Sequence, residues 1–123
     1  MVTVPSFLLR RLYVKESLRN TGSGFEFQLR NRLGSGYAHR LWPLTVDGAE
    51  VPLDSAFFEL DGASTPFSEV SKEKTFTLAM NRTITIRAEG PRLEAGARKI
   101  GMGFDVPGLG TLRFDFTDMV EDG

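Results

Sequence analysis

The stretch KIGMGFDVPGLGTLRFDF, residues 99–116, decides the fold of this chain. Apolar residues occupy every second position on both sides of a turn: Ile100, Met102, Phe104, Val106, Leu112, Phe114 and Phe116. A period of two places successive side chains on opposite faces of a pleated strand. The segment Pro107-Gly108-Leu109-Gly110 between the two runs has the residue types of a tight turn. The stretch therefore predicts an antiparallel hairpin with one apolar and one polar face.

The same period recurs along the rest of the chain. Phenylalanine and leucine alternate with polar residues over 25–30, and isoleucine alternates with threonine over 83–86. Short alternating runs separated by glycine-containing turns are typical of sandwiches and barrels. We therefore predict an all-β fold in a single domain over residues 1–123, namely an antiparallel β-sandwich, jelly-roll-like or a flattened barrel. The last residues, 119–123, are expected to form a frayed tail.

Two segments are less regular than the others. Residues 7–20 are expected to form a strand with a break. Ser68–Thr75 is the one segment whose charges and capping serine suit a short helical turn.

Composition narrows the function. The chain has 123 residues, of which 41% are hydrophobic and 25% charged, close to the average for soluble domains. Fifteen basic residues nearly cancel sixteen acidic ones, so the net charge of −1 predicts neither a nucleic-acid nor a membrane partner. The lack of cysteine excludes disulfides, thiolate metal sites and a cysteine nucleophile. No segment approaches the ~18 apolar residues of a membrane span, and we expect a cytoplasmic protein.

The least common side chains gather between Arg30 and Pro52. This run holds the only histidine, His39, the only tryptophan, Trp42, and one of the two tyrosines, Tyr37. One imidazole and no cysteine cannot build a three-histidine zinc site or a Cys–His pair. A Ser–His–Asp triad is formally possible, but the sequence has no Gly-x-Ser-x-Gly motif to present a serine nucleophile. We therefore predict no catalytic, cofactor-binding or metal-binding residue in this chain.

Trp42 has two interpretations. With Leu44 and Val46 it forms an alternating apolar face, which favours a place in the core. The alternative is a projecting sheet edge that contacts a partner or the rim of a substrate pocket, formed by Tyr37, His39, Arg40 and Trp42. Tyrosine, tryptophan and arginine are the residue types that dominate interface hot spots.

Three carboxylates lie on or beside the last hairpin: Asp105, Asp115 and Asp118. Facing strands would bring Asp105 and Asp115 together, and a carboxylate pair at the right separation suits glycoside hydrolysis. Both residues fall on the polar phase of their strands, however, which favours a solvated face balanced by nearby cations. Gly101-Met102-Gly103 begins like a dinucleotide fingerprint, but the third glycine and a βαβ pattern are missing.

The order of motifs resembles a known family. The motifs run from Ser17 to Phe116: SLRN at 17–20, GFEFQLR at 24–30, LTVDGAEVP at 44–52, FFELDG at 57–62, TITI at 83–86 and GPRLEAG at 90–96. In this order the chain resembles the small (β) subunit of bacterial C-glycoside deglycosidases. The chain departs from that family over Leu33–Arg40, where the family has a Tyr/Arg-rich run, so no substrate contact is carried over.

The resemblance implies an accessory subunit of a hetero-oligomeric lyase. Such an enzyme cleaves the carbon–carbon bond between sugar and aglycone in 3-oxo-C-glucosides of flavonoid type. Catalysis is expected on a large α subunit with a TIM barrel and a divalent metal, manganese or magnesium. The isolated small subunit would then be inactive, without a cofactor of its own, and its partners would be the α subunit and the C-glycoside. The alternative is a stand-alone carbohydrate- or polyphenol-binding module.

Overall fold

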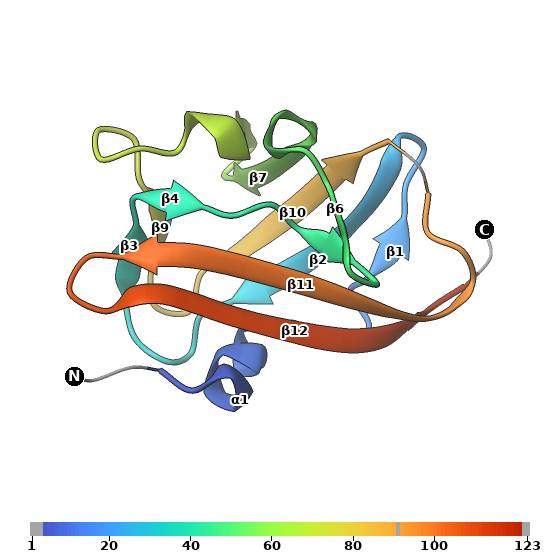
Figure 1. Cartoon of the computed structure of the whole chain (residues 1–123), viewed down its shortest axis with the longest axis horizontal. Helices are drawn as coiled ribbons and strands as arrows, with labels where there is room; N and C mark the ends of the chain where they lie inside the picture. The colour runs from blue at the N-terminus through green and yellow to red at the C-terminus, as the bar shows by residue number, and fades with distance from the viewer. Residues whose placement is uncertain (1–3, 91, 122–123) are drawn as a thin grey trace.

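The computed structural model describes residues 4–90 and 92–121 and shows a chain built mainly of strands (Figure 1). The helical elements are α1 (Ser6–Leu9) and the 3-10 turns η1 (Arg10–Leu12), η2 (Leu53–Ser55) and η3 (Phe67–Glu69). The strands are β1 (Arg19–Asn20), β2 (Gly24–Arg30), β3 (Gly36–Ala38), β4 (Arg40–Leu41), β5 (Thr45–Val46), β6 (Ala49–Glu50), β7 (Ala56–Leu60), β8 (Ala63–Pro66), β9 (Phe76–Leu78), β10 (Thr83–Glu89), β11 (Gly96–Val106) and β12 (Gly110–Val120). In the described part of the chain, no helix has the length and apolar character needed to cross a membrane.

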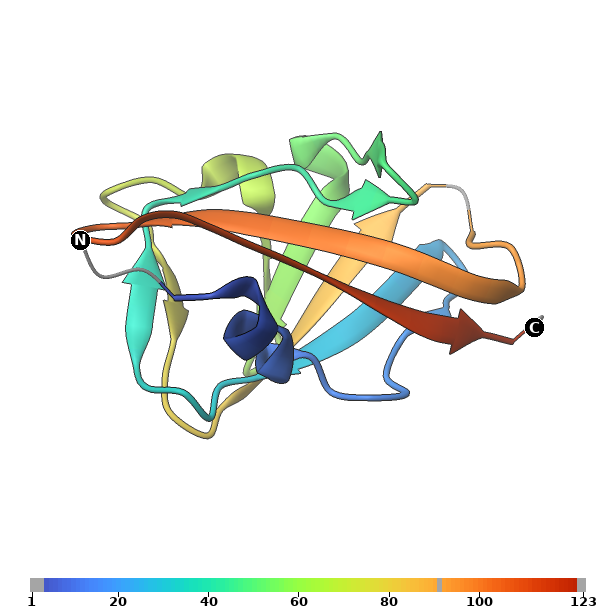
Figure 2. The same ribbon diagram turned by 60° about the horizontal axis from the view of Figure 1, so that its bottom comes forward.

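Two antiparallel sheets pack against each other, and a two-stranded ribbon lies at one end (Figures 1 and 2). One sheet, the β2 sheet, has the order β1-β2-β10-β7-β8. The other, the β11 sheet, has the order β12-β11-β5-β6, with β4 also paired to β11, and β3 pairs with β9 in the ribbon. The long β11–β12 hairpin runs obliquely across β2 and β10 in Figure 1. The predicted antiparallel all-β fold is confirmed, and the described strands do not close into a barrel.

Residues 99–116 form the predicted hairpin and one side of the core. β11 and β12 pair continuously from Gly96 opposite Val120 to Val106 opposite Gly110. The alternating apolar side chains of this hairpin are buried: Ile100, Met102, Phe104, Leu112, Phe114 and Phe116. Those of the β2 sheet belong to the same cluster: Phe25, Phe27, Leu29, Ile84 and Ile86. Removal of this apolar surface from water, at roughly 25 cal/mol per Å², is the main force that holds the two sheets together.

Tyr13 ties the N-terminal segment to the sandwich. Its ring stacks on Phe116 with 3.6 Å between ring centroids and meets Phe27 edge-on at 6.2 Å. Its hydroxyl donates to Asp118 Oδ2 at 2.7 Å and accepts from the Leu18 N–H at 3.1 Å. Burial, reinforced by the Asp118 carboxylate, raises the pKa of Tyr13 to about 12. The hydroxyl therefore remains a protonated donor throughout the neutral range.

The prediction of a strand over residues 7–20 is wrong for its first half, which forms α1 and η1. Leu9 and Leu12 are both buried, and their spacing of three is that of a helical face rather than of a strand. The helical turn predicted within Ser68–Thr75 starts one residue earlier, at Phe67, and ends at Glu69. Strand β8 was not among the predicted strands.

The C-terminal strand is longer than predicted. β12 continues to Val120, which is buried and pairs with Gly96 of β11. The expected frayed tail therefore does not begin at Met119. Residues 122–123 of that expected tail lie outside the described residues.

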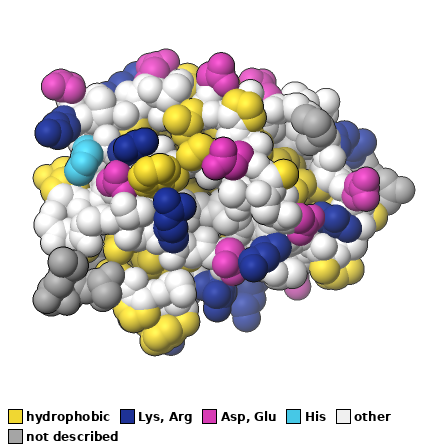
Figure 3. Space-filling view, viewed as in Figure 1, with side chains coloured by type: hydrophobic (Ala, Val, Ile, Leu, Met, Phe, Trp, Pro, Cys, Tyr) yellow, Lys and Arg dark blue, Asp and Glu magenta, His cyan; other side chains and the backbone are white. Residues whose placement is uncertain are grey.

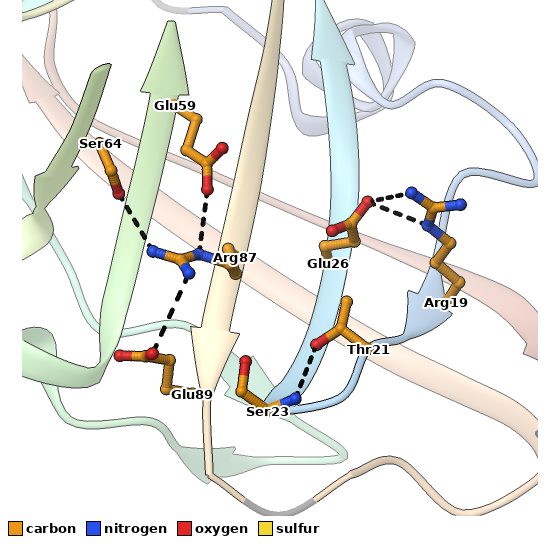
Figure 4. Close-up of polar contacts among 8 residues, drawn as sticks. All are labelled: Arg19, Thr21, Ser23, Glu26, Glu59, Ser64, Arg87 and Glu89. Carbon is orange, nitrogen blue, oxygen red and sulfur yellow. Dashed lines mark hydrogen bonds and ion pairs between the residues drawn. The ribbon is translucent and has the colours of Figure 1, made fainter. Parts of the chain in front are cut away.

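Ion pairs cover the outer face of the β2 sheet (Figure 4). On β10, Arg87 lies between two carboxylates, with Nε 3.1 Å from Glu59 Oε1 and Nη1 4.0 Å from Glu89 Oε2. Nearer the other edge, Arg19 donates through Nε and Nη2 to Glu26 Oε2 at 2.9 and 2.7 Å. Exposed pairs of this kind contribute about 0–1 kcal/mol each. The charges of this face thus largely neutralise one another.

Candidate functional site

Trp42 follows β4 directly and lies on the outer face of the β11 sheet. Its backbone N–H donates to the Gly103 carbonyl oxygen at 2.9 Å. A Cβ atom at Gly103 would lie 3.5 Å from Trp42 Cβ and 3.2 Å from Arg113 Cγ. The absence of a side chain at position 103 therefore leaves the space in which Trp42 and Arg113 pack over β11.

Asp105 anchors the indole ring. Trp42 Nε1 donates to Asp105 Oδ1 at 2.8 Å, and the Thr111 hydroxyl donates to the same oxygen at 2.6 Å. Desolvation alone would raise the pKa of Asp105, but these hydrogen bonds and the neighbouring Arg40 and His39 side chains outweigh it. The pKa of Asp105 consequently lies below its usual value of 3.8, and the carboxylate is ionised at neutral pH.

Two guanidinium groups lie against the indole. Cζ of Arg40 is 4.1 Å and Cζ of Arg113 is 4.9 Å from the ring centroid. Cation–π contacts at such distances contribute about 0.5–1 kcal/mol each at exposed sites. Both arginines are exposed, and neither forms an ion pair with a carboxylate of residues 4–90 or 92–121. Arg40, Trp42, Asp105, Thr111 and Arg113 together are called the Trp42 cluster below.

The molecular face that carries the β11 sheet mixes charge and apolar surface. Figure 3 views this face and shows Lys, Arg, Asp and Glu side chains interspersed with separate hydrophobic ones. No single hydrophobic patch dominates the described surface in that view. A partner for this face would accordingly need polar as well as aromatic contacts.

The structure brings some of the predicted contact residues together and separates one of them. Arg40 and Trp42 belong to the cluster, and the His39 backbone N–H donates to the Asp105 carbonyl oxygen at 3.0 Å. The half-buried His39 also borders a shallow depression that Arg40 and Asp105 line. Tyr37 is 50% exposed on the β3–β9 ribbon and borders a different, mostly apolar cavity. The four residues therefore do not form one site.

The carboxylates of the last hairpin do not form a catalytic pair. Asp105 pairs with Thr111, whereas Asp115 pairs with Gly101, so the hairpin register separates the two aspartates. Asp115 instead lies 3.6 Å from a guanidinium nitrogen of Arg10. The interpretation of a solvated face with balancing cations therefore describes Asp115, whereas Asp105 is held by Trp42 and Thr111.

Sequence reasoning missed Thr111 and Arg113 as members of the cluster. Arg113 reaches Trp42, and Thr111 reaches Asp105, because β4 and β12 both pair with β11, on its two sides. The available signal was the pair of glycines, Gly101 and Gly103, on the outward phase of β11. They mark the positions over which side chains from neighbouring strands pack.

The fold and the site define a small antiparallel β-sandwich domain with an anchored aromatic and cationic surface cluster. Residues 8–121 match the family model for the hydroxymethylglutaryl-CoA reductase, N-terminal domain. The chain belongs to this family. No curated protein matches the chain. In residues 4–90 and 92–121, no three His, Cys, Asp or Glu side chains gather in a way that would hold a metal ion.

The family match corrects the resemblance to C-glycoside deglycosidases, which is wrong. The accessory role in carbon–carbon bond cleavage, the flavonoid C-glycoside substrate and the TIM-barrel α-subunit partner are withdrawn with it, as is the carbohydrate- or polyphenol-binding alternative. Two of the motifs that suggested that family, at 44–52 and 57–62, contain hairpin turns. Asp47-Gly48 and Asp61-Gly62 have φ values of 50° and 91° and of 52° and 82°, and both join adjacent antiparallel strands. Any tight hairpin favours such residues, so they report the fold and not the family.

Replacement of Asp105 by asparagine tests the anchor. We expect the free energy of unfolding at pH 7 to fall by about 1–2 kcal/mol, because charge-assisted hydrogen bonds from Trp42 and Thr111 become neutral ones. Since the folded-state pKa of Asp105 is depressed, its stabilising contribution is present above the ordinary value of 3.8 and is lost as the pH falls through the folded-state pKa. Urea titrations from pH 7 to pH 2.5 should show the wild type and Asp105→Asn converging. A difference that stays constant with pH would contradict this account.

Proposed function

We propose that this chain is a non-catalytic binding domain of a hydroxymethylglutaryl-CoA reductase-type protein, and that the Trp42 cluster is its contact surface. The observation that carries the proposal is the pair of exposed guanidinium groups held on an anchored indole, at 4.1 and 4.9 Å from the ring centroid. The family match supports the proposal, because it assigns residues 8–121 to one named domain of a reductase.

The chemistry of the cluster suits binding better than bond-making. Asp105 Oδ1 already accepts two hydrogen bonds, and the lowered pKa of Asp105 makes this carboxylate a weak base at neutral pH. Guanidinium groups stay protonated and act as donors only. The purified chain alone should therefore not consume hydroxymethylglutaryl-CoA when NADH and NADPH are supplied, and turnover by it would contradict the proposal.

The partner surface that fits the cluster carries carboxylates. Arg40 and Arg113 each present donors that no described carboxylate engages, and stacking on Trp42 limits the number of conformations they sample. Preorganised arginines beside a tryptophan are typical of binding hot spots. We place the complementary acidic surface on the catalytic part of the reductase. The proposal includes a cytoplasmic location and the absence of a cofactor in this chain, which the lack of cysteine and the residue types of the cluster support.

A titration of the chain with the catalytic polypeptide of a hydroxymethylglutaryl-CoA reductase from the same genome tests the surface. The emission of the single tryptophan should change on binding, because Trp42 lies at the proposed contact. Arg113→Glu should weaken binding at least ~10-fold by placing like charges together. The matched control is Arg92→Glu, an exposed arginine outside the cluster, which should bind as the wild type does. Absence of binding, or equal effects of the two variants, would overturn the proposal.

A further inference from the structure

A second concave surface lies beside the N-terminal helix. It is a groove of about 950 Å³ between the N-terminal segment and the adjoining strands β2 and β12. Tyr13 and Phe116, which stack on each other, are among its lining residues. Figure 2 brings this side forward and shows α1 next to β12. The groove shares no residue with the Trp42 cluster, so the two surfaces can be tested separately.

Positive charge is concentrated in this groove. Five of the fifteen basic residues of the chain line it: Arg10, Arg11, Lys15, Arg30 and Arg32. Two of the sixteen acidic residues do so, Glu16 and Asp118. Asp118 already accepts hydrogen bonds from the Tyr13 hydroxyl and the Glu16 N–H at 2.7 and 2.8 Å. The groove is thus cationic although the chain as a whole is slightly acidic.

Three of the four arginines in the groove are available to a ligand. Arg10 is already engaged, since its Nε donates to the Asp115 carbonyl oxygen at 2.7 Å. Arg11, Arg30 and Arg32 are exposed and form no ion pair within residues 4–90 and 92–121. A guanidinium group binds carboxylates through parallel N–H donors, so this trio suits an anionic ligand with several carboxylates.

The groove also contains part of an open strand edge. β12 is the edge strand of the β11 sheet. The carbonyl groups of Gly103 and Asp105 accept hydrogen bonds from the residues Trp42 and His39, on the side of β11 away from β12. In an antiparallel pair, the partners of residues that face away also face away. Residues of β12 with odd numbers therefore direct their peptide groups to the open edge.

Two contacts agree with this assignment. The Asp115 carbonyl oxygen receives its hydrogen bond from Arg10, which lies outside the β11 sheet. The Met119 N–H is satisfied by the carboxylate of the preceding residue, Asp118, at 2.8 Å. Thr117, between them, lines the groove, and no described residue forms a hydrogen bond with its peptide group at the open edge. An extended polypeptide could pair there as a strand does.

We propose that this groove binds an extended acidic segment of a partner polypeptide. The carboxylates of the segment lie against Arg11, Arg30 and Arg32, and its main chain hydrogen-bonds to the open peptide group of Thr117. The edge of β12 favours a polypeptide over a nucleic acid. The acidic balance of the remaining surface also opposes the broad positive field on which nucleic-acid binding depends.

Binding of a fluorescein-labelled decaglutamate peptide tests the charge requirement. Decaglutamate should bind more weakly as salt is raised, and a decaglutamine peptide should not bind. Arg11→Glu/Arg30→Glu should weaken binding at least ~10-fold, because two attractions become repulsions. The matched control, Lys72→Glu/Arg92→Glu, makes the same change in net charge outside the groove and should bind within about twofold of the wild type. Equal losses in both double variants, or equally tight binding of single-stranded DNA, would overturn the proposal.

Amide hydrogen exchange tests the strand edge in the unmodified chain. Saturation with decaglutamate should slow exchange of the Thr117 amide at least ~10-fold, because its N–H becomes hydrogen-bonded. Thr111 lies on the same open edge but outside the groove, and its exchange should not change. An unaltered Thr117 rate at saturation, or equal slowing at Thr111, would overturn the placement of the segment along β12.

Discussion

Gly24→Ala is expected to lower the free energy of unfolding by about 3 kcal/mol or to prevent folding. Gly24 is buried at the start of β2, where it pairs with Glu89 of β10. A Cβ atom at this position would overlap the carbonyl oxygen of Ala88 and lie 3.0 Å from its carbonyl carbon. Both atoms belong to the backbone of a strand that is paired on each side, so no rotamer change relieves the contact. The neighbouring strands β2 and β10 would have to separate at this point.

Gly22→Ala is the matched control for this prediction. Its added Cβ atom has no neighbour within 4 Å, although the position is only two residues away. Alanine there should leave stability within about 0.5 kcal/mol of the wild type. Thermal and urea unfolding followed by far-ultraviolet circular dichroism measure both variants. Comparable stability of Gly24→Ala and Gly22→Ala would show that β2 and β10 are not as closely paired as described.

The long strands could be predicted from the sequence because apolar and polar residues alternate along most of their length. In the hairpin of residues 99–116, both arms carry apolar residues on one phase, and the turn residues between them are distinctive. The segment 7–20 is different, since Pro5 precedes it and its buried leucines, Leu9 and Leu12, follow a helical spacing over a single turn. Strand β8 has no apolar alternation at all and ends in Pro66. An edge strand tolerates a proline and the lack of an apolar alternation, and β8 lies at the edge of its sheet and pairs only with β7.

Only part of the candidate site could be predicted from the sequence. Arg40 and Trp42 are neighbours in the chain, and their residue types alone indicate a contact surface. Asp105 and Arg113 reach the indole through the pairing of three strands, which no local pattern encodes. The sequence pattern placed the carboxylate of Asp105 on a solvated face. In the structure, its Oδ1 accepts hydrogen bonds from the indole N–H of Trp42 and from the Thr111 hydroxyl. The residue types of a short segment thus indicated the kind of site. Which other residues belong to the site depends on the pairing register of strands that are distant in the sequence.

The family assignment failed for a related physical reason. Turns such as Asp47-Gly48 adopt positive φ values, which favour the same few residues in every tight hairpin. A succession of such turns between alternating strands therefore recurs in unrelated sandwiches. The match to the family model, in contrast, extends over residues 8–121, which include the strands as well as the turns.

Phe27→Ala is expected to cost about 3–5 kcal/mol of unfolding free energy. Phe27 is fully buried on β2 and meets Phe116 of β12 and Tyr13 edge-on, with ring centroids 5.1 and 6.2 Å apart. Its loss leaves a cavity at the point where both sheets and the N-terminal segment converge. Domains of this size have total stabilities of about 5–15 kcal/mol, so the variant should lie near the limit of folding.

The control for Phe27→Ala removes the same ring from the surface. Phe7 is 62% exposed on α1, and Phe7→Ala should change stability by no more than about 0.5 kcal/mol. If Phe27→Ala does not fold, Phe27→Leu retains most of the apolar volume and should show a smaller, measurable loss in urea titrations. Near-ultraviolet circular dichroism should also weaken in Phe27→Leu, since the stacked Tyr13 loses a packing neighbour. Equal stabilities of Phe27→Ala and Phe7→Ala would contradict the description of a shared core, because only a ring that both sheets cover can produce the difference.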